Sequence, residues 1–279
     1  MCGVTGFIHL NGDAVSPVIL RKMTDAIAHR GPDGEGHWIE GNVGLGHRRL
    51  AIIDLTPAGH QPMITADQRF VLSYNGEIYN YREIRTELEA LGYWFRSQTD
   101  SEVVLNALAH WGSDALLKFN GMFGLALWDR KEQTMLLARD RYGIKPLYYA
   151  RQGNTFAFGS EQKAITAQPT FKRELNKPAL LEYFTFQNIF TDQTLLKDIH
   201  LLPAGHYAVL HVPTGKWCQH QYWDYRFREP DQKASKKEYL EELDRLFKQA
   251  VNRQLVSDVD IGAYLSGGMD SGSITALAA

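Results

Sequence analysis

The chain has 279 residues, of which 44% are hydrophobic and 22% charged, and its net charge is −2 with an isoelectric point near 6.6. These values are ordinary for a globular protein of one large domain or two smaller ones. They exclude extensive disorder, and they leave no excess of basic residues for a nucleic-acid partner or an anionic membrane.

Residues 1–222 alternate short apolar runs with turn residues, a pattern that predicts a strand-rich α+β domain. The predicted strands are Val43–Leu45, Phe70–Tyr74, Phe123–Trp128, Thr134–Ala138, Tyr148–Tyr149 and Phe156–Phe158. Two segments interrupt them with helical spacing, Tyr81–Leu91 and Ser101–Trp111, because their apolar side chains recur every three or four residues.

Residues 226–237 are polar, carry mixed charges and include a proline, so they predict a linker between domains. A helix is expected next, because Ser235 and Glu238 form a capping box ahead of an apolar stripe that ends near Leu255. Ile261–Leu265 then predicts a strand that leads into a second helix.

Residues 238–279 would therefore form the truncated beginning of an α/β nucleotide-binding domain, which needs several strand–helix units to complete its sheet. We expect this segment to pack poorly by itself and residues 1–222 to fold independently.

The two cysteines, Cys2 and Cys218, are too few for a disulfide framework, and neither lies in a zinc-binding pattern. The start of the chain lacks the features of a secretory signal or a myristoylation site, and the apolar stretches are too short for a membrane span. We therefore expect a cytoplasmic protein without a membrane partner, in which Cys218 is a packed strand residue.

Cys2 follows Met1, and its side chain is small enough to allow removal of that methionine. The freed α-amine, with an ordinary pKa of about 8, could take the proton of the thiol directly or through a water. Taken alone, however, Cys2 is better explained as an incidental residue at a frayed end.

Polar residues elsewhere could complete an acyl-transfer site around Cys2. Asn75 and Gly76 follow a predicted strand at a turn, and they offer a side-chain amide and an unobstructed backbone N–H to an oxyanion. Arg49 could bind an α-carboxylate through two hydrogen bonds, and Asp100 precedes a predicted helix. Each has an ordinary alternative, since Asn-Gly is a common hairpin turn, a surface arginine can be solvated and aspartate is a frequent N-cap.

Eight segments in order resemble the class II glutamine amidotransferases, which are N-terminal-nucleophile hydrolases. They are MCGVTGF, HRGPDGEG, GHRRLAIIDL, LSYNGEIYNYREIR, TDSEVV, GMFGLALWD, ARDRYGIKPLYY and FGSEQKA. Together with the SGGMDS that follows, they look like the glutamine-hydrolysing asparagine synthetases over essentially the whole chain. For residues 1–222 the resemblance implies an αββα sandwich, in which two antiparallel sheets stack between helical layers.

The resemblance also implies a role for each matching residue. Cys2 would form a γ-glutamyl thioester, with Asn75 and Gly76 as the oxyanion hole. The residues implied for glutamine binding are Arg49 at the α-carboxylate, the backbone of Leu50, Ala51, Ile52 and Ile53 beside it, Asn75 and Gly76, and Glu77 and Asp100 at the α-ammonium.

Ser266–Ser271 follows a predicted strand and opens a predicted helix, where backbone N–H groups can approach a phosphate. The segment lacks the Walker A pattern and resembles the pyrophosphate-binding loop of ATP pyrophosphatases, which adenylate a carboxylate. The resemblance implies ATP and Mg²⁺ as cofactors. The residues implied are Tyr264 and Leu265 near the nucleotide, Ser266, Gly267, Gly268, Asp270 and Ser271 at the phosphates, and Asp270 as a magnesium ligand.

The implied substrates are glutamine, aspartate and ATP, with ammonia passing from the first site to a β-aspartyl-AMP, and a homodimer is compatible with this assignment. An enzyme of the same kind that amidates another carboxylate, on a cell-envelope or natural-product molecule, remains an alternative, because the family's acceptor-binding residues lie beyond residue 279. SGGMDS argues against the phosphosugar amidotransferases, and Cys2 argues against a β-lactam-synthetase-like enzyme. A non-catalytic interaction fragment stays open for the second half.

Overall fold

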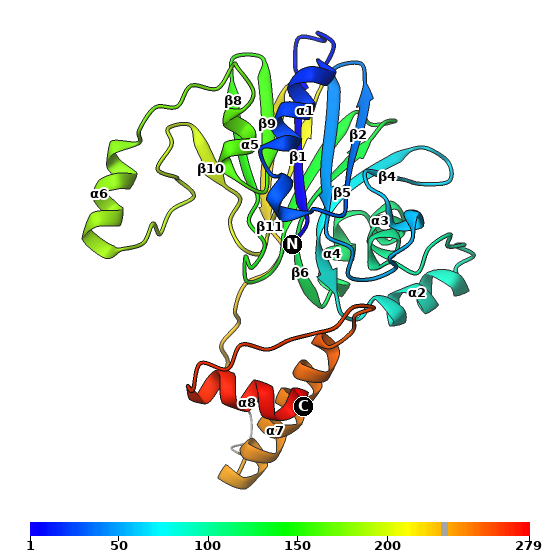
Figure 1. Cartoon of the computed structure of the whole chain (residues 1–279), viewed down its shortest axis with the longest axis vertical. Helices are drawn as coiled ribbons and strands as arrows, with labels where there is room; N and C mark the ends of the chain where they lie inside the picture. The colour runs from blue at the N-terminus through cyan, green and yellow to red at the C-terminus, as the bar shows by residue number, and fades with distance from the viewer. Residues whose placement is uncertain (230–233) are drawn as a thin grey trace.

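The computed structural model describes residues 1–229 and 234–279. Figure 1 shows a large body and, below it, a lobe made of α7 (Lys236–Gln254) and α8 (Met269–Ala278). Residues 224–229, which enter the predicted linker, are exposed and without regular structure. Residues 230–233 of that linker lie outside the described residues.

Among the described residues, two antiparallel sheets make up the body. The first contains β1 (Gly3–His9), β2 (Gly34–Glu40), β3 (Val43–Arg49), β8 (Tyr148–Gln152), β9 (Thr155–Gly159) and β10 (Ile199–Leu201), in the order β10-β8-β9-β1-β3-β2. The second contains β4 (Met63–Ile64), β5 (Phe70–Ile78), β6 (Gly121–Asp129), β7 (Thr134–Arg139), β11 (His206–His211) and β12 (Lys216–Gln221), in the order β12-β11-β7-β6-β5-β4. Every segment predicted as a strand in the first 222 residues lies within one of them.

Helices cover the outer face of each sheet (Figure 1). The first sheet carries α1 (Pro17–Asp25) and α5 (Gln162–Thr166), and the second carries α2 (Tyr81–Ala90), α3 (Asp100–Trp111) and α4 (Ala115–Lys118). Short 3-10 turns occur at Ala28–Arg30, Pro57–Gly59 and Gly112–Asp114. These layers confirm the αββα sandwich.

The expectation of two helical interruptions in residues 1–222 was wrong. α2 and α3 match it, but α1, α4, α5 and the projecting α6 (Lys177–Phe186) add to it. α4 and α5 are too short to show a helical period. α1 begins with Pro17 in its first turn, which is a favourable position for proline, and buries Leu20 and Met23.

The strand period places successive side chains of β1 in different layers. Val4 and Ile8 pack between the two sheets, against Val71 and other residues of the second sheet. Phe7 points the other way and packs with Leu20 of α1. All of β1 is consequently buried except its last residue, which fixes the strand that follows Cys2 at the centre of the body.

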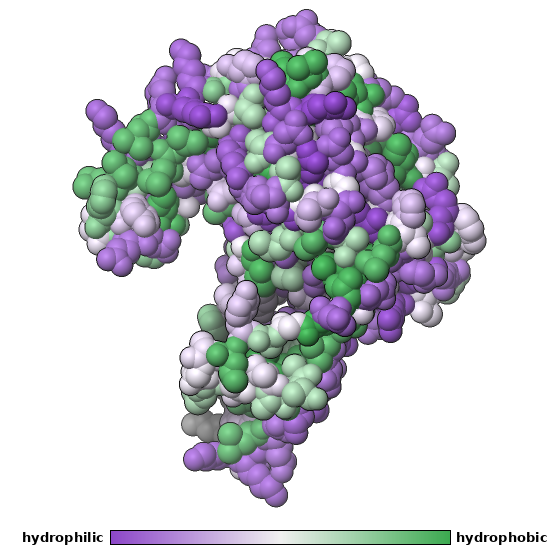
Figure 2. Space-filling model, viewed as in Figure 1, coloured by the Kyte–Doolittle hydropathy of each residue, from purple (hydrophilic) through white to green (hydrophobic). Residues whose placement is uncertain are grey.

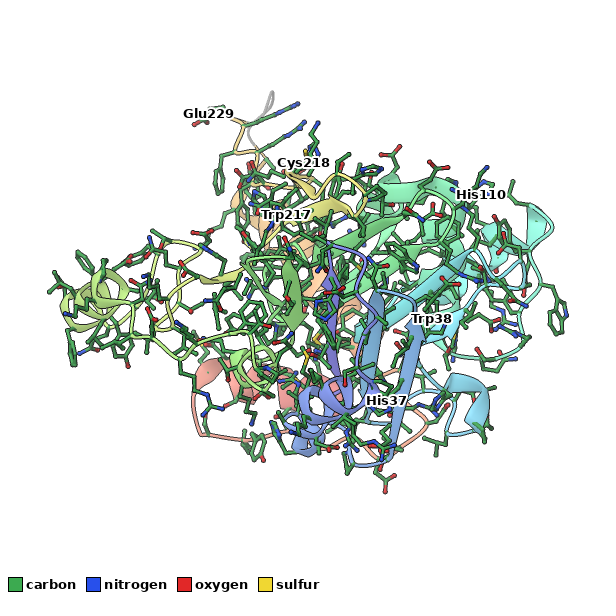
Figure 3. All side chains as sticks on the ribbon, turned by 90° about the horizontal axis from the view of Figure 1, so that it is seen from above. His37, Trp38, His110, Trp217, Cys218 and Glu229 are labelled. Carbon is green, nitrogen blue, oxygen red and sulfur yellow. The ribbon has the colours of Figure 1, made fainter. Side chains whose placement is uncertain are left out.

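α6 stands away from the body between β9 and β10 and exposes large apolar side chains (Figures 1 and 2). The large apolar side chains exposed on α6 and just after it are Leu181, Tyr183, Phe184, Phe186 and Phe190. Cys218 lies in β12 beside Trp217 (Figure 3), which confirms it as a strand residue, although it is only partly buried.

α7 begins with the predicted capping box. The Ser235 hydroxyl accepts from the N–H of Glu238 at 3.3 Å, and the Glu238 carboxylate accepts from the N–H of Ser235 at 2.6 Å. The predicted strand Ile261–Leu265 was wrong, because the segment has no regular structure and no described strand pairs with it. α8 follows, as predicted.

Limited proteolysis is expected to cut first within the exposed residues 224–229 or 259–268 and to leave residues 1–222 intact. α7 and α8 expose much of their apolar surface, with Leu240 and Leu243 at 55% and 62%. Mass spectrometry of the early fragments is the measurement. A protected fragment that contained residues 238–279 would contradict the expectation.

Candidate active site

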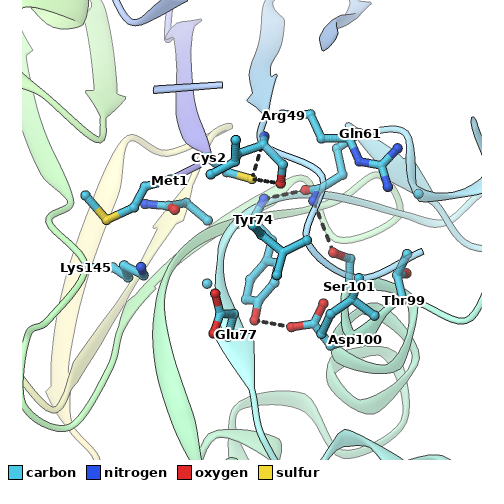
Figure 4. Close-up of a pocket in the computed structure, with 16 residues that line it drawn as sticks. Met1, Cys2, Arg49, Gln61, Tyr74, Glu77, Thr99, Asp100, Ser101 and Lys145 are labelled. Carbon is cyan, nitrogen blue, oxygen red and sulfur yellow. Dashed lines mark hydrogen bonds between the residues drawn. The ribbon is translucent and has the colours of Figure 1, made fainter. Parts of the chain in front are cut away.

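A pocket lies beside the start of β1, near the end of β3, the end of β5 and the first turn of α3 (Figure 4). Its lining is Met1, Cys2, Arg49, Leu50, Ile52, Ile53, Gly59, Gln61, Tyr74, Asn75, Gly76, Glu77, Thr99, Asp100, Ser101 and Lys145. The residues that the sequence assigned to a glutaminase site thus meet in one cavity, with the exception of Ala51. Its N–H donates to the Asp33 carboxylate at 2.9 Å.

Cys2 is held just ahead of β1 by contacts from two neighbouring segments. The N–H of Leu50 donates to the Cys2 sulfur at 3.3 Å, and the Arg30 guanidinium donates to the Cys2 carbonyl at 2.8 Å. Burial raises the pKa of the Cys2 thiol, and the Leu50 N–H opposes that rise. The resting group is therefore a thiol, which needs a base before it can act as a nucleophile.

Asn75 is directed at Cys2 from β5. In the amide orientation that satisfies both groups, the Asn75 nitrogen donates to the Cys2 carbonyl at 3.0 Å, and its oxygen accepts from Arg30 at 3.3 Å. Asn75 is 1% exposed, so these partners keep a buried amide satisfied.

The predicted turn at Asn75-Gly76 was wrong, because β5 continues through both residues to Ile78. Gly76 pairs with Phe123 of β6, and a Cβ at Gly76 would collide with the carbonyl of Met122. The glycine is thus required by close approach of the next strand and not by a turn.

Arg49, the last residue of β3, folds over the loop that follows it. Its guanidinium donates to the carbonyl of Thr56 at 2.8 Å and to that of Asp54. The guanidinium also lies over Gly59, where any side chain would collide with it. Arg49 therefore shapes the loop that carries Leu50, Ile52 and Ile53 into the pocket, while it lines the pocket itself.

Asp100 is the first residue of α3 and not its N-cap. Thr99 caps the helix by accepting from the N–H of Glu102 at 3.2 Å. One oxygen of the Asp100 carboxylate accepts from the Tyr74 hydroxyl at 2.8 Å and from the N–H of Ile78 at 3.0 Å. Burial raises the pKa of Asp100 to about 6, and these two bonds oppose the rise. The Asp100 carboxylate therefore does not cap α3, and it lines the pocket.

Lys145 is a pocket residue that the sequence reasoning missed. It is 5% exposed, and burial lowers the pKa of its ammonium while the nearby Glu77 opposes that change. Burial likewise raises the pKa of Glu77, opposed by Lys145. The signal was present, since Lys145 stands in ARDRYGIKPLYY, one of the segments that carried the resemblance.

Gln61 was also missed, and it joins β5 to the first turn of α3 beside the cavity. Its oxygen accepts from the N–H of Tyr74 at 2.7 Å, and its nitrogen donates to the Ser101 hydroxyl at 3.2 Å. His47 adds a link between the sheets, because its Nε2 donates to the Tyr74 carbonyl at 3.0 Å. Burial lowers the pKa of His47 to about 3, so this imidazole is neutral.

Comparisons with known proteins identify the family of the chain and relatives of its fold. The model of the glutamine amidotransferase domain matches residues 1–223, which is most of the chain. The chain belongs to the glutamine amidotransferase family. The model of asparagine synthase matches residues 242–279 of this amidotransferase.

The amidotransferase is 38% identical to asparagine synthetase [glutamine-hydrolyzing] 3 of Bacillus subtilis, over 100% of this chain and 45% of the relative. It is 36% identical to a putative asparagine synthetase [glutamine-hydrolyzing] 2 of Methanocaldococcus jannaschii, over 98% and 56%. Amidase chry2 of Gibberella zeae is 35% identical, over 99% and 42%. The chain spans about half the length of the curated relatives that it matches.

Two solved structures share the fold. The allosteric regulatory enzyme of purine biosynthesis has a TM-score of 0.60 at 19% identity, over 80% of this chain and 49% of that one. Glutamine phosphoribosylpyrophosphate amidotransferase from Bacillus subtilis has a TM-score of 0.59 at 17% identity, over 99% and 64%. Among the described helices of the amidotransferase, none is both long and apolar enough to cross a membrane.

The Ser266–Ser271 loop of the amidotransferase has a backbone suited to a phosphate. Gly267 has a φ of +81°, Gly268 is the N-cap of the ten-residue α8, and the Ser266 and Ser271 hydroxyls lie 2.9 Å apart. Backbone N–H groups at such a helix start favour an anion. These residues therefore fit the phosphate end of a nucleotide.

The described residues provide neither a packed surface for the nucleoside nor a full set of metal ligands at the expected nucleotide site. Tyr264 and Leu265 are 99% and 65% exposed, so their side chains have little packing around them. No group of three or more His, Cys, Asp or Glu residues suited to a metal ion occurs in the described ranges, and Asp270 would thus need ligands from elsewhere to hold magnesium.

Proposed function

We propose that the amidotransferase hydrolyses glutamine through Cys2 and supplies the ammonia for ATP-dependent conversion of aspartate to asparagine. The observation that carries the first half is the meeting of Cys2, Asn75, Arg49 and Asp100 in one pocket. The second half is supported by the likeness to asparagine synthetases and by the phosphate-suited loop at Ser266–Ser271.

In this proposal, the α-amine of Cys2 becomes the base once Met1 is removed. It takes the thiol proton, and the sulfur attacks the side-chain amide carbon of glutamine. The Asn75 amide and the Gly76 N–H would stabilise the oxyanion. The protonated α-amine then gives this proton to the leaving nitrogen, so ammonia departs as the carbon–nitrogen bond breaks, and water hydrolyses the thioester to glutamate.

Recognition of the α-amino acid end falls to charged groups around the cavity. The carboxylates of Asp100 and Glu77 would bind the α-ammonium, and Arg49 would bind the α-carboxylate. ATP, with Mg²⁺, would supply the adenylyl group that activates the acceptor carboxylate. Residues Ser266–Ser271 would hold its phosphates through their N–H groups and hydroxyls.

The acceptor has one further candidate. Amidase chry2, which is not named as an asparagine synthetase, is about as similar to the chain as the asparagine synthetases are, and this favours as second candidate an acceptor other than aspartate. Glutamine labelled with ¹⁵N in its amide, supplied with ATP, Mg²⁺ and aspartate to the protein, tests the first choice. Labelled asparagine is expected, and label incorporated into the amide of another added carboxylic acid, with none in asparagine, would count against aspartate.

Arg49→Ala is expected to raise the KM for glutamine about tenfold or more, because a charge-assisted contact with the substrate carboxylate is lost. Steady-state release of glutamate measures it. Arg48→Ala is the matched control, since Arg48 contacts Asp25 and Glu35 on the other side of the strand and does not line the pocket. An unchanged KM in Arg49→Ala would remove this residue from the site.

A further inference from the structure

The segment between α7 and α8 contacts the loop that lines the glutamine pocket. In Figure 1 this segment rises from the lower lobe to the lower edge of the body, near α2. Asp258 makes the contact through two hydrogen bonds. Its carboxylate accepts from the N–H of Asp54 at 2.7 Å, and its own N–H donates to the carbonyl of Ile52 at 2.9 Å.

Two neighbouring contacts hold this segment against the body. Val256 is partly buried and packs, as Ile53 does, against the apolar cluster under α2 and α3. The Arg253 guanidinium lies 3.8 Å from the carboxylate of Glu83 on α2. Arg253 at the end of α7 and Val256 and Asp258 after it therefore all contact the part of the amidotransferase domain formed by α2 and the loop that contains Ile53.

The atoms that Asp258 holds lie on each side of Ile53. The Ile52 carbonyl precedes this residue and the Asp54 N–H follows it, and both Ile52 and Ile53 line the pocket. Arg49 holds the same loop from the pocket side through the carbonyls of Asp54 and Thr56. The loop is thus fastened on two sides, by residues more than 200 positions apart in the sequence.

We propose that Asp258 is a positioning residue that sets the affinity of the pocket for glutamine by holding the backbone of Ile52–Asp54. The inference rests on the proposed glutaminase function of that pocket. It assigns to the segment before the Ser266–Ser271 loop a part in the first half-reaction, although Asp258 itself touches no substrate.

Three variants test the proposal. Asp258→Ala removes the acceptor of the Asp54 N–H, and Asp258→Asn keeps an oxygen that can accept it. Asp260→Ala is the matched control, because Asp260 is an exposed carboxylate two residues further on and has no hydrogen bond to the loop among those the described residues make. The main-chain bond from residue 258 to Ile52 survives in all three.

In the whole chain, Asp258→Ala is expected to raise the KM for glutamine about threefold to tenfold, with kcat changed by less than about twofold. Hydrogen exchange at the amide of Asp54 should accelerate in the same variant. Asp258→Asn should restore both quantities, and Asp260→Ala should match the unchanged protein.

Unaltered exchange at Asp54 in Asp258→Ala, or an unaltered KM despite faster exchange, would overturn the proposal. A loss of kcat without a change in KM would also overturn it, because that result indicates general damage to the site. Failure of the unchanged protein to hydrolyse glutamine would refute the proposed function alone. The exchange comparison would then still decide whether Asp258 holds the loop.

Discussion

Cys2→Ala is expected to lower the rate of glutamine hydrolysis by at least about a thousandfold and to leave the fold unchanged. The variant cannot form a thioester, so only direct attack by water on the bound amide remains. The substitution removes one sulfur at a position just before β1, whose own side chains form the core. Alanine is also small enough to permit removal of Met1, so the α-amine is still freed.

Release of glutamate and of ammonia measures the reaction, and thermal unfolding measures the fold. Cys218→Ala provides the matched control, since it removes the other cysteine from β12, outside the pocket. That control should retain the activity of the unchanged protein. Glutaminase activity that persisted in Cys2→Ala would show that another group is the nucleophile.

Asp100→Asn is expected to weaken glutamine binding and, at the same time, to stabilise the protein above pH 6. The uncharged amide cannot pair with the α-ammonium, so the KM should rise by about tenfold or more. In the unchanged protein, the pKa of about 6 predicts a KM that rises as the pH falls below 6 and Asp100 becomes protonated. Asp100→Asn should lack that dependence.

The effect on stability has the opposite sign. Burial raises the pKa of Asp100 from 3.8 to about 6, so the native state favours the protonated acid. The resulting stabilisation is present below pH 3.8 and is lost as the pH rises through 6, at a cost of about 3 kcal/mol in the free energy of unfolding.

Asparagine carries no charge and can place one oxygen where Tyr74 and Ile78 now donate to Asp100. The variant should therefore unfold at a higher temperature than the unchanged protein at pH 8, and the difference should shrink as the pH approaches 4. Denaturation curves at both pH values, beside the KM profile, are the measurement. A variant that was less stable at pH 8 would show that the hydrogen bonds of the ionised carboxylate stabilise the protein by more than burial of its charge destabilises it.

The sequence predicts the layers of the body and the membership of the pocket, but not the order of the strands within each sheet. The αββα arrangement and the pocket residues followed from motifs that occur together, whereas Cys2 alone was compatible with an accidental residue. Asn75-Gly76 was misread as a turn because local turn preference cannot show that β6 approaches Gly76 closely. That approach is a property of the assembled sheet.

Other differences have the same origin in tertiary structure. Ile261–Leu265 has the composition of a strand, but a strand forms only where a neighbour supplies hydrogen bonds, and the described residues supply none there. Gln61 makes its hydrogen bonds with residues 13 and 40 positions away, and no local sequence pattern predicts such contacts. The contact of Asp258 with Asp54 spans 204 positions and was equally invisible.

The fastening of residues 50–56 from two sides also has a thermodynamic consequence for ligand capture. Ordering the backbone of one residue costs about 1–2 kcal/mol of free energy at room temperature, because its conformational entropy falls. A segment that is already ordered by Arg49 and Asp258 undergoes this loss during folding and not when glutamine arrives. Binding to such a preorganised wall should retain more of its contact energy as affinity, so the protein's own folding contributes part of the affinity of the pocket for its ligand.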